Sequence, residues 1–183
     1  MFKMRCTMLC HLLVLIIVLT ACQPNIPWNA FNSTKGNFSI LMPTTPTEDS
    51  VTEDMGVLGK IGVFTYTVEE SYGAFIVAYS DFPADVMKQI DPYTVLDAGV
   101  TGFSSFVTGK AAGKILSTKS ISWKNRFPGR EFRAQTENGD AQAVGRAYLI
   151  NARLYVILGE MPTGGFSDSE MNKFLDSFDL LKS

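Results

Sequence analysis

Histidine and cysteine are nearly absent from this chain of 183 residues, which has one histidine and three cysteines. They all lie within the first 22 residues, so the chain from Gln23 to Ser183 has neither type. Ser-His-Asp and Cys-His catalysis needs an imidazole, and zinc or transition-metal sites normally draw on His and Cys. A disulfide needs two thiols. Residues 23–183 therefore exclude these classes of site.

The chain also lacks a large excess of positive or negative charge, and it lacks apolar runs long enough for several membrane spans. The formal net charge is −2 and 46% of the residues are hydrophobic, which argues against a nucleic-acid binder, a disordered tail and a multi-span membrane protein. Gly109–Lys114 lacks the glycine spacing of a phosphate loop, and Ile115 follows where Ser or Thr is needed. No acidic calcium-loop pattern occurs. We expect no metal, no cofactor and no nucleic-acid partner.

The first 21 residues read as an export signal. Lys3 and Arg5 precede the apolar run Leu12–Leu19, which is too short to span a bilayer comfortably. The ending Leu19-Thr20-Ala21-Cys22 resembles the lipobox of bacterial lipoproteins. The resemblance implies cleavage before Cys22, a thioether-linked lipid on its sulfur and acylation, including palmitate, of its new amino group. The alternatives are an uncleaved anchor helix and a soluble exported protein.

This resemblance also implies a location. The protein would sit on the exported side of a membrane in the cell envelope, held in the bilayer by acylated Cys22, since several acyl chains anchor stably. Gln23, rather than Asp, follows the cysteine. In a Gram-negative organism this points to the periplasmic leaflet of the outer membrane. Cleavage would remove two cations and leave a formal charge of −4.

Three segments organise the chain: a signal peptide at 1–21, a lipidated N-terminus and flexible tether at 22–36, and one α/β domain at 37–183. Prolines, asparagines and a glycine in 23–36 argue against regular structure. A coil of that length reaches about 20 Å. Trp28 and Phe31 would touch either the membrane interface or the domain.

Alternating and helical patterns predict the elements of the domain. We expect a loop at 44–56, helices at 91–107 and from Ser167 onward, and strands at 38–43, 60–68, 72–79, 114–123, 129–137, 141–150 and 154–159. Asp91-Pro92 starts the first helix, and Ser167 with Glu170 forms a capping box for the second. Gly99 and Gly102 let the first helix lie close to a sheet. The strands 72–79 and 154–159 are apolar on both faces and are therefore central.

The predicted order is β-β-β-α-β-β-β-β-α, with hairpin connections at Asn138-Gly139 and Asn151-Ala152. Hairpins imply a mostly antiparallel sheet, and two amphipathic helices imply cover on both faces. The expected fold class is α+β, as a three-layer α/β/α sandwich.

Several segments carry a resemblance to a known fold, namely Phe38–Pro43, Tyr72–Pro83, Pro128–Phe132, Arg146–Tyr155 and Phe174–Phe178. Together they resemble uncharacterised bacterial exported proteins of PsbP/Mog1/DcrB-like fold. Proteins of that fold serve as extrinsic photosystem subunits, as a Ran-binding factor and as bacterial lipoproteins. The resemblance implies binding or assembly rather than catalysis, and it transfers no active site.

Basic residues cluster between positions 110 and 133, while 48–54 carries four acids and no base. This asymmetry predicts a dipolar domain. The candidate interaction patch consists of Lys119, Trp123, Lys124, Arg126, Arg130 and Arg133. It would dock on an acidic protein or on anionic headgroups. The alternative is solvated charge along an exposed sheet edge.

Two functions remain. The first is a non-catalytic binding or assembly module anchored in the envelope. The second is an envelope hydrolase that uses only Asp, Glu, Ser or Lys. The adjacent pair Glu69-Glu70 does not favour the second, since neighbours on a strand point to opposite faces. A deep pocket with converging carboxylates would favour the hydrolase, and a shallow charged surface the binding module.

Overall fold

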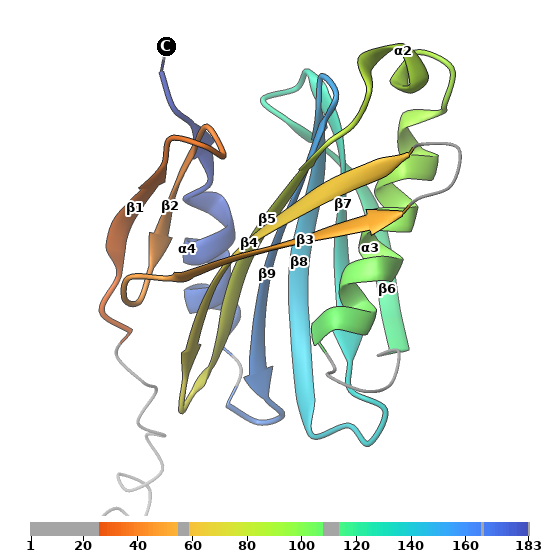
Figure 1. The fold of residues 1–183 in the computed structure, drawn as a ribbon. Coiled ribbons are helices and arrows are strands. Elements are labelled where there is room, and N and C mark those ends of the chain that lie inside the picture. Colours follow the sequence, from red (N-terminus) through yellow and green to blue (C-terminus); the bar gives the residue numbers. More distant parts are fainter. Residues whose placement is uncertain (1–25, 55–58, 108–113, 166, 183) are drawn as a thin grey trace, which may run out of the picture.

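A seven-stranded antiparallel sheet forms the centre of the molecule (Figure 1). The computed structural model describes residues 26–54, 59–107, 114–165 and 167–182, with the backbone alone at 103–107. Across the sheet the strands run in the order β3 (Thr47–Asp54), β4 (Lys60–Glu70), β5 (Gly73–Asp81), β9 (Arg153–Pro162), β8 (Ala141–Ile150), β7 (Phe127–Gln135) and β6 (Lys114–Trp123). The edges are therefore β3 and β6.

Each face of this sheet has its own cover and its own apolar core. Helix α3 (Pro92–Val107) lies on one face, after the short α2 (Ala84–Met87). Helix α4 (Asp168–Asp176) covers the other face, together with a small sheet. That sheet has the order β1 (Asn29–Ser33), β2 (Phe38–Met42) and β10 (Asp179–Leu180). The two clusters of buried side chains lie on either side of the large sheet.

The strands predicted to be central are central. β9 is the fourth of seven strands and six consecutive residues in it are buried. β5 is its neighbour and also has six consecutive buried residues. Apolar side chains on the two faces of these strands thus pack in the two cores, as expected for strands covered on both sides.

Helix α3 begins where the sequence predicts. The backbone N–H of Thr94 donates to the Asp91 carboxylate at 3.0 Å, which is the hydrogen bond of an N-cap residue. A Cβ at Gly99 would lie 2.8 Å from Cδ2 of Leu154, so this glycine allows the close approach to the sheet. Gly102 has open space instead. The predicted packing role is therefore confirmed at Gly99 and wrong at Gly102.

Helix α4 shows half of the predicted capping box. The Ser167 hydroxyl accepts from the backbone N–H of Glu170 at 3.3 Å. The Glu170 carboxylate accepts from Nε1 of Trp28 at 2.5 Å. The carboxylate thereby ties the N-terminal segment to the start of α4.

The N-terminal segment differs from the predicted tether. Ile26 is 4% exposed and belongs to the core, and Asn29–Ser33 pairs with β2 along its whole length. Trp28 and Phe31 pack against that core, so the domain includes at least residues 26–36. A partner strand distant in the sequence supplies the order that local composition does not predict.

The predicted loop 44–56 is also wrong over much of its length, because Thr47–Asp54 is the edge strand β3. All eight of its residues are exposed, so no alternation of apolar and polar residues marks the strand. With β1, α2 and β10 also added, the predicted element order is incomplete. The layer opposite α3 contains a small sheet as well as a helix, so the plain α/β/α description is corrected to a mixed outer layer.

Candidate functional site

The tip of the β6–β7 hairpin, residues Trp123–Phe127, is the candidate site and is called the basic hairpin below. The backbone N–H of Arg126 donates to the carbonyl of Trp123 at 3.0 Å and closes a tight turn. The central residues Lys124 and Asn125 have φ of 49° and 54°. Turns of this kind favour Asn-Gly, and a lysine rarely adopts this conformation. Lys124, an exposed cation, thus occupies a backbone conformation in which glycine would be less strained.

Each cation of the basic hairpin lies over an aromatic ring. Lys124 Nζ is 4.4 Å from the centroid of the Trp123 ring, and the guanidinium carbon of Arg126 is 4.9 Å from that of Phe127. Both rings are half-buried and pack against the core on the α4 side. Cation–π contacts of this kind are worth about 0.5–1 kcal/mol at exposed sites. The rings therefore restrict the two charges to the hairpin surface.

An acidic side chain of β10 faces the basic hairpin. Lys124 Nζ lies 2.5 Å from a carboxylate oxygen of Asp179 at the start of β10. The hydrogen bond from Lys124 lowers the pKa of Asp179. Both side chains are about half exposed, so solvent screens the pair and a competing carboxylate can reach the lysine.

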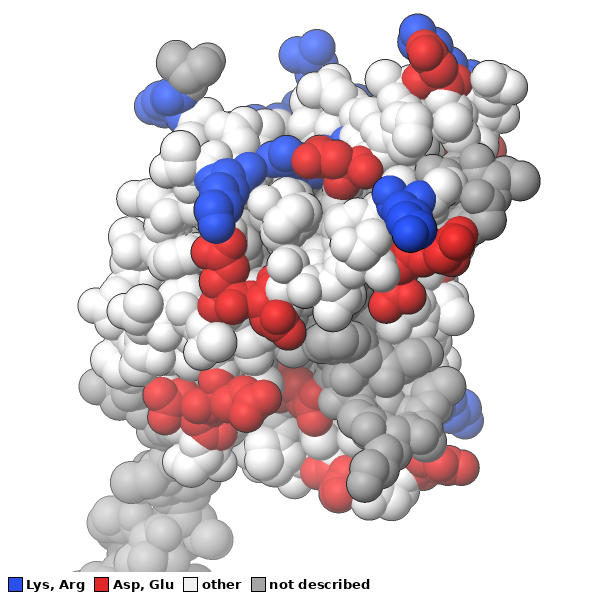
Figure 2. All heavy atoms as spheres, viewed as in Figure 1, with Lys and Arg blue, Asp and Glu red and all other residues white. Residues whose placement is uncertain are grey.

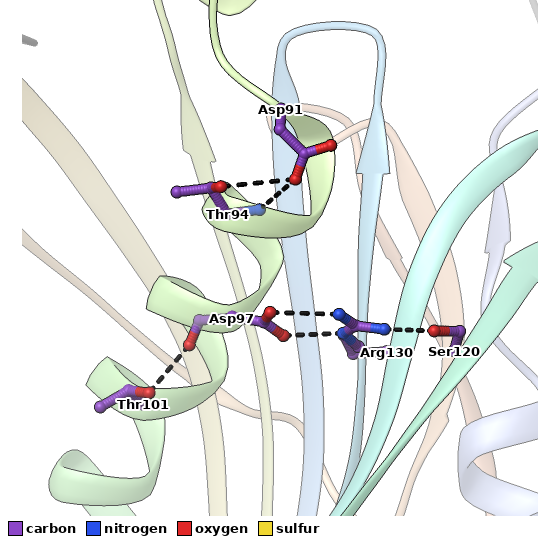
Figure 3. A network of polar contacts seen from close by, with 6 residues as sticks. All are labelled: Asp91, Thr94, Asp97, Thr101, Ser120 and Arg130. Atoms are coloured by element: carbon purple, nitrogen blue, oxygen red, sulfur yellow. Dashed lines mark hydrogen bonds and ion pairs between the residues drawn. The ribbon is translucent and has the colours of Figure 1, made fainter.

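Arg130 belongs to a separate network on the α3 face (Figure 3). Its guanidinium binds both carboxylate oxygens of Asp97 on α3, at 2.7 and 3.1 Å, and also donates to Ser120. The hydrogen bond from Arg130 lowers the pKa of the Asp97 carboxyl. Arg130 therefore joins α3 to the edge of the sheet.

Arg133 and Lys119 lie on the opposite, α4 face. Arg133 pairs with Asp168 at 2.8 Å, and Lys119 is the cross-strand partner of Glu131. Glu131 in turn pairs with Arg146, which also binds Asp176 of α4. The six-residue patch predicted from sequence is therefore not one surface. Only Trp123, Lys124 and Arg126 of that set share the hairpin tip.

Further cations lie at the same end of the sheet. The β1–β2 turn brings Lys35 there, because Arg153 donates to the Lys35 and Gly36 carbonyls. The C-terminal segment after β10 lies at this end as well, because the backbone N–H of Leu181 donates to the carbonyl of Asn37, next to the β1–β2 turn. Figure 2 shows most of the visible Lys and Arg toward the end of the molecule where the C-terminus lies, and mainly Asp and Glu at the other end. Charge is thus divided along the strands, but not between the two predicted segments. Glu48 pairs with Lys35 at 2.8 Å, at the basic end, and Lys114 lies opposite Gln135, at the other end of the sheet.

The opposite end carries a cleft of about 610 Å³, called the acidic cleft. The described residues that line it include four carboxylates and no lysine or arginine: Glu69, Glu70, Asp140 and Glu160. Glu69 and Glu160 lie on one face, with Ala74 between them in the cross-strand row. Burial, followed by the charge of Asp140, raises the pKa of Glu160. The sequence did not indicate this cluster, because strand register alone assembles it.

Among the described residues, no group of three or more His, Cys, Asp or Glu side chains has a metal-binding arrangement. No helix in the same part of the chain is long and apolar enough to cross a bilayer. Cys22, the predicted lipidation residue, lies outside the described residues.

A comparison with known protein families finds none that matches this chain, and no curated protein matches it. The structure is similar to the solution structure of cyanobacterial PsbP (CyanoP) from Synechocystis sp. PCC 6803. The TM-score is 0.50 and the identity 14%, over 88% of this chain and 98% of that chain. At this identity the likeness concerns fold alone. It confirms the PsbP-like α+β fold that the sequence resemblance implied.

Proposed function

We propose that this protein is a lipoprotein of the cell envelope that acts as a non-catalytic binding or assembly module. Acylated Cys22 anchors it in a membrane on the exported side. The basic hairpin is its docking surface and takes a partner with clustered carboxylates. The lipobox-like segment Leu19–Cys22 supports the anchor, and the PsbP-like fold is consistent with an accessory role.

The cations of the basic hairpin carry the docking part of this proposal. Most other arginines of the described sheet are bound to carboxylates within the domain. Arg126, by contrast, is exposed and lies on a ring at a chain reversal. A cation fixed on a ring loses little side-chain entropy on binding. This surface is an exposed, charged hairpin tip, the kind that favours a protein partner over a small substrate.

Fractionation tests the anchor. Wild-type protein expressed in a Gram-negative bacterium should remain with the membranes, and its mature form should carry the mass of a diacylglyceryl group and an amide-linked acyl chain. Cys22→Ala should abolish both the added mass and the membrane association. Wild-type protein found soluble, or with its leader intact, would refute the anchor.

Binding of poly-L-glutamate tests the docking surface. Arg126→Glu should weaken binding at low salt about tenfold, equivalent to about 1.4 kcal/mol. Lys173→Glu is the matched control, because it makes the same charge change at an exposed position on α4. Equal affinity of the two variants would contradict a specific role for the hairpin.

The acidic cleft supports one alternative, an envelope hydrolase. Glu160 has the raised pKa expected of a general acid, and Glu69 lies on the same face two strands away. The cleft carboxylates other than Glu160 are exposed, which disfavours this alternative. Hydrolysis of cell-wall polymer or chromogenic glycosides by purified protein, abolished in Glu160→Gln, would establish the hydrolase.

A further inference from the structure

The chain is fixed to the domain almost immediately after the predicted lipidation site. Ile26 is buried in the core. The centroid of the Trp28 ring lies 5.2 Å from that of Phe75 and 6.0 Å from that of Phe174. The indole N–H of Trp28 donates to the Glu170 carboxylate. β1 then pairs with β2 over five residues. These contacts leave little chain between the lipid and the folded domain.

The length of that connection follows from the sequence. Four peptide units join Cys22 to Ile26. They span at most about 14 Å in any conformation, since an extended chain advances about 3.3–3.6 Å per residue. A lipid on Cys22 thus keeps the surface around Ile26 within about that distance of the headgroups.

The strand register shows which end of the sheet this surface belongs to. Trp28 contacts Phe75, which follows the β4–β5 turn and pairs with Gly159. The neighbouring row, Ala74 and Glu160, lines the acidic cleft. We call this end of the sheet, with Ile26 and the acidic cleft, the anchor pole.

The basic hairpin lies at the other end. Strand β7 begins at Phe127 of the hairpin and ends at Gln135, beside Thr136 of the acidic cleft. Nine residues of antiparallel strand measure about 30 Å. That exceeds both the reach of the connection and the Debye length of about 8 Å at physiological salt. With the anchor pole at the bilayer, the hairpin is beyond the electrostatic range of the headgroups beneath it.

We propose that the anchor pole faces the bilayer that holds the lipid, and that the basic hairpin points away from it and binds an acidic segment of a protein. This rests on the lipidation of Cys22 in the proposed function. It decides between the two partner chemistries that the basic residues alone leave open, because an outward-pointing hairpin does not meet the headgroups of its own membrane.

The orientation is measured with two single-cysteine labels on the acylated protein. The thioether at Cys22 leaves the mature chain without another thiol. Ser71→Cys places a label in the β4–β5 turn at the anchor pole, and Ser122→Cys places one beside the basic hairpin. Both serines are exposed, so the substitutions are matched. The proteins are reconstituted in phosphatidylglycerol-containing vesicles with a quencher on some headgroups.

We expect the Ser71 label to be quenched severalfold more strongly than the Ser122 label. Poly-L-glutamate added outside should bind the vesicle-held protein, and Arg126→Glu should lose that binding while Lys173→Glu keeps it. Equal or stronger quenching at Ser122 would overturn the inference and assign the hairpin to headgroups. Failure to bind poly-L-glutamate while the Ser71 label is quenched would overturn the acidic-protein partner alone. Protein without acyl mass, or absent from floated vesicles, would refute the anchor itself.

Discussion

Replacing Trp28 with alanine tests whether the N-terminal segment belongs to the folded domain. The ring contacts two phenylalanines, each contact worth about 0.5–1.5 kcal/mol beyond its buried area. The indole N–H binds a carboxylate, a bond worth about 1.5–3 kcal/mol when the acceptor is charged. Because the side chain is only half-buried, we expect the lower end of the range for buried Trp→Ala, about 3 kcal/mol.

Urea denaturation of the mature protein gives the free energy of unfolding directly, and the melting temperature should fall by about 6–12 °C. Trp28→Phe is the control, because it keeps the ring contacts and loses the N–H donor. It should cost about 1.5 kcal/mol, the lower end of the range for a bond to a charged acceptor, because the pair is only part-buried. A loss below about 1 kcal/mol for Trp28→Ala would show that the segment is a loose tether. The inferred orientation would then lose its support.

Two further predictions concern packing and charge. Gly99→Ala should destabilise the fold by about 1–3 kcal/mol, because its Cβ would press on Leu154. Gly102→Ala, in open space, should stabilise α3 by up to about 1 kcal/mol. Thermal unfolding should therefore show melting temperatures that shift in opposite directions for the two variants. Glu160→Gln should raise the melting temperature at pH 7 by about 1–2 °C. The pKa of Glu160 is raised in the fold, so its charged form opposes folding at pH 7, and the gain should vanish below about pH 4, where the carboxyl is neutral in both states. A gain that persisted at low pH would have another cause.

The sequence predicted best those elements whose signals are local. Caps at Asp91 and Ser167 and the doubly apolar strands β5 and β9 appear where expected. β1 and β3 were missed because their stability comes from pairing with β2 and β4, which no local pattern reveals. Propensity is a weak guide for such strands, since cross-strand neighbours decide their stability.

The candidate site was predictable only in part. Arg130 and Arg133 are three residues apart on one strand, and the two-residue period places them on opposite faces. The sequence therefore held the signal that the patch is divided. The pairing of Lys124 with Asp179 joins residues that are 55 positions apart in the sequence. The acidic cleft lies between the β4–β5 turn, the β7–β8 turn and the end of β9. Register over long separations decides both, so neither follows from local pattern.

The position of the exposed cations of the basic hairpin has a physical reason in this fold. Arg130 and Arg146 are 18% and 16% exposed at the side chain, and a cation so far withdrawn from water needs a bound carboxylate. Such arginines stabilise the helices against the sheet and are unavailable to a ligand. Cations at a hairpin tip keep most of their hydration, so Arg126 is stable without a buried carboxylate, and the pair of Lys124 with Asp179 stays about half exposed. Because α3, α4 and a small sheet cover the faces of the large sheet, its strand ends are the places where cations stay exposed, as the proposed docking surface requires. In the proposed orientation, the short link to Cys22 leaves one of those ends turned away from the membrane.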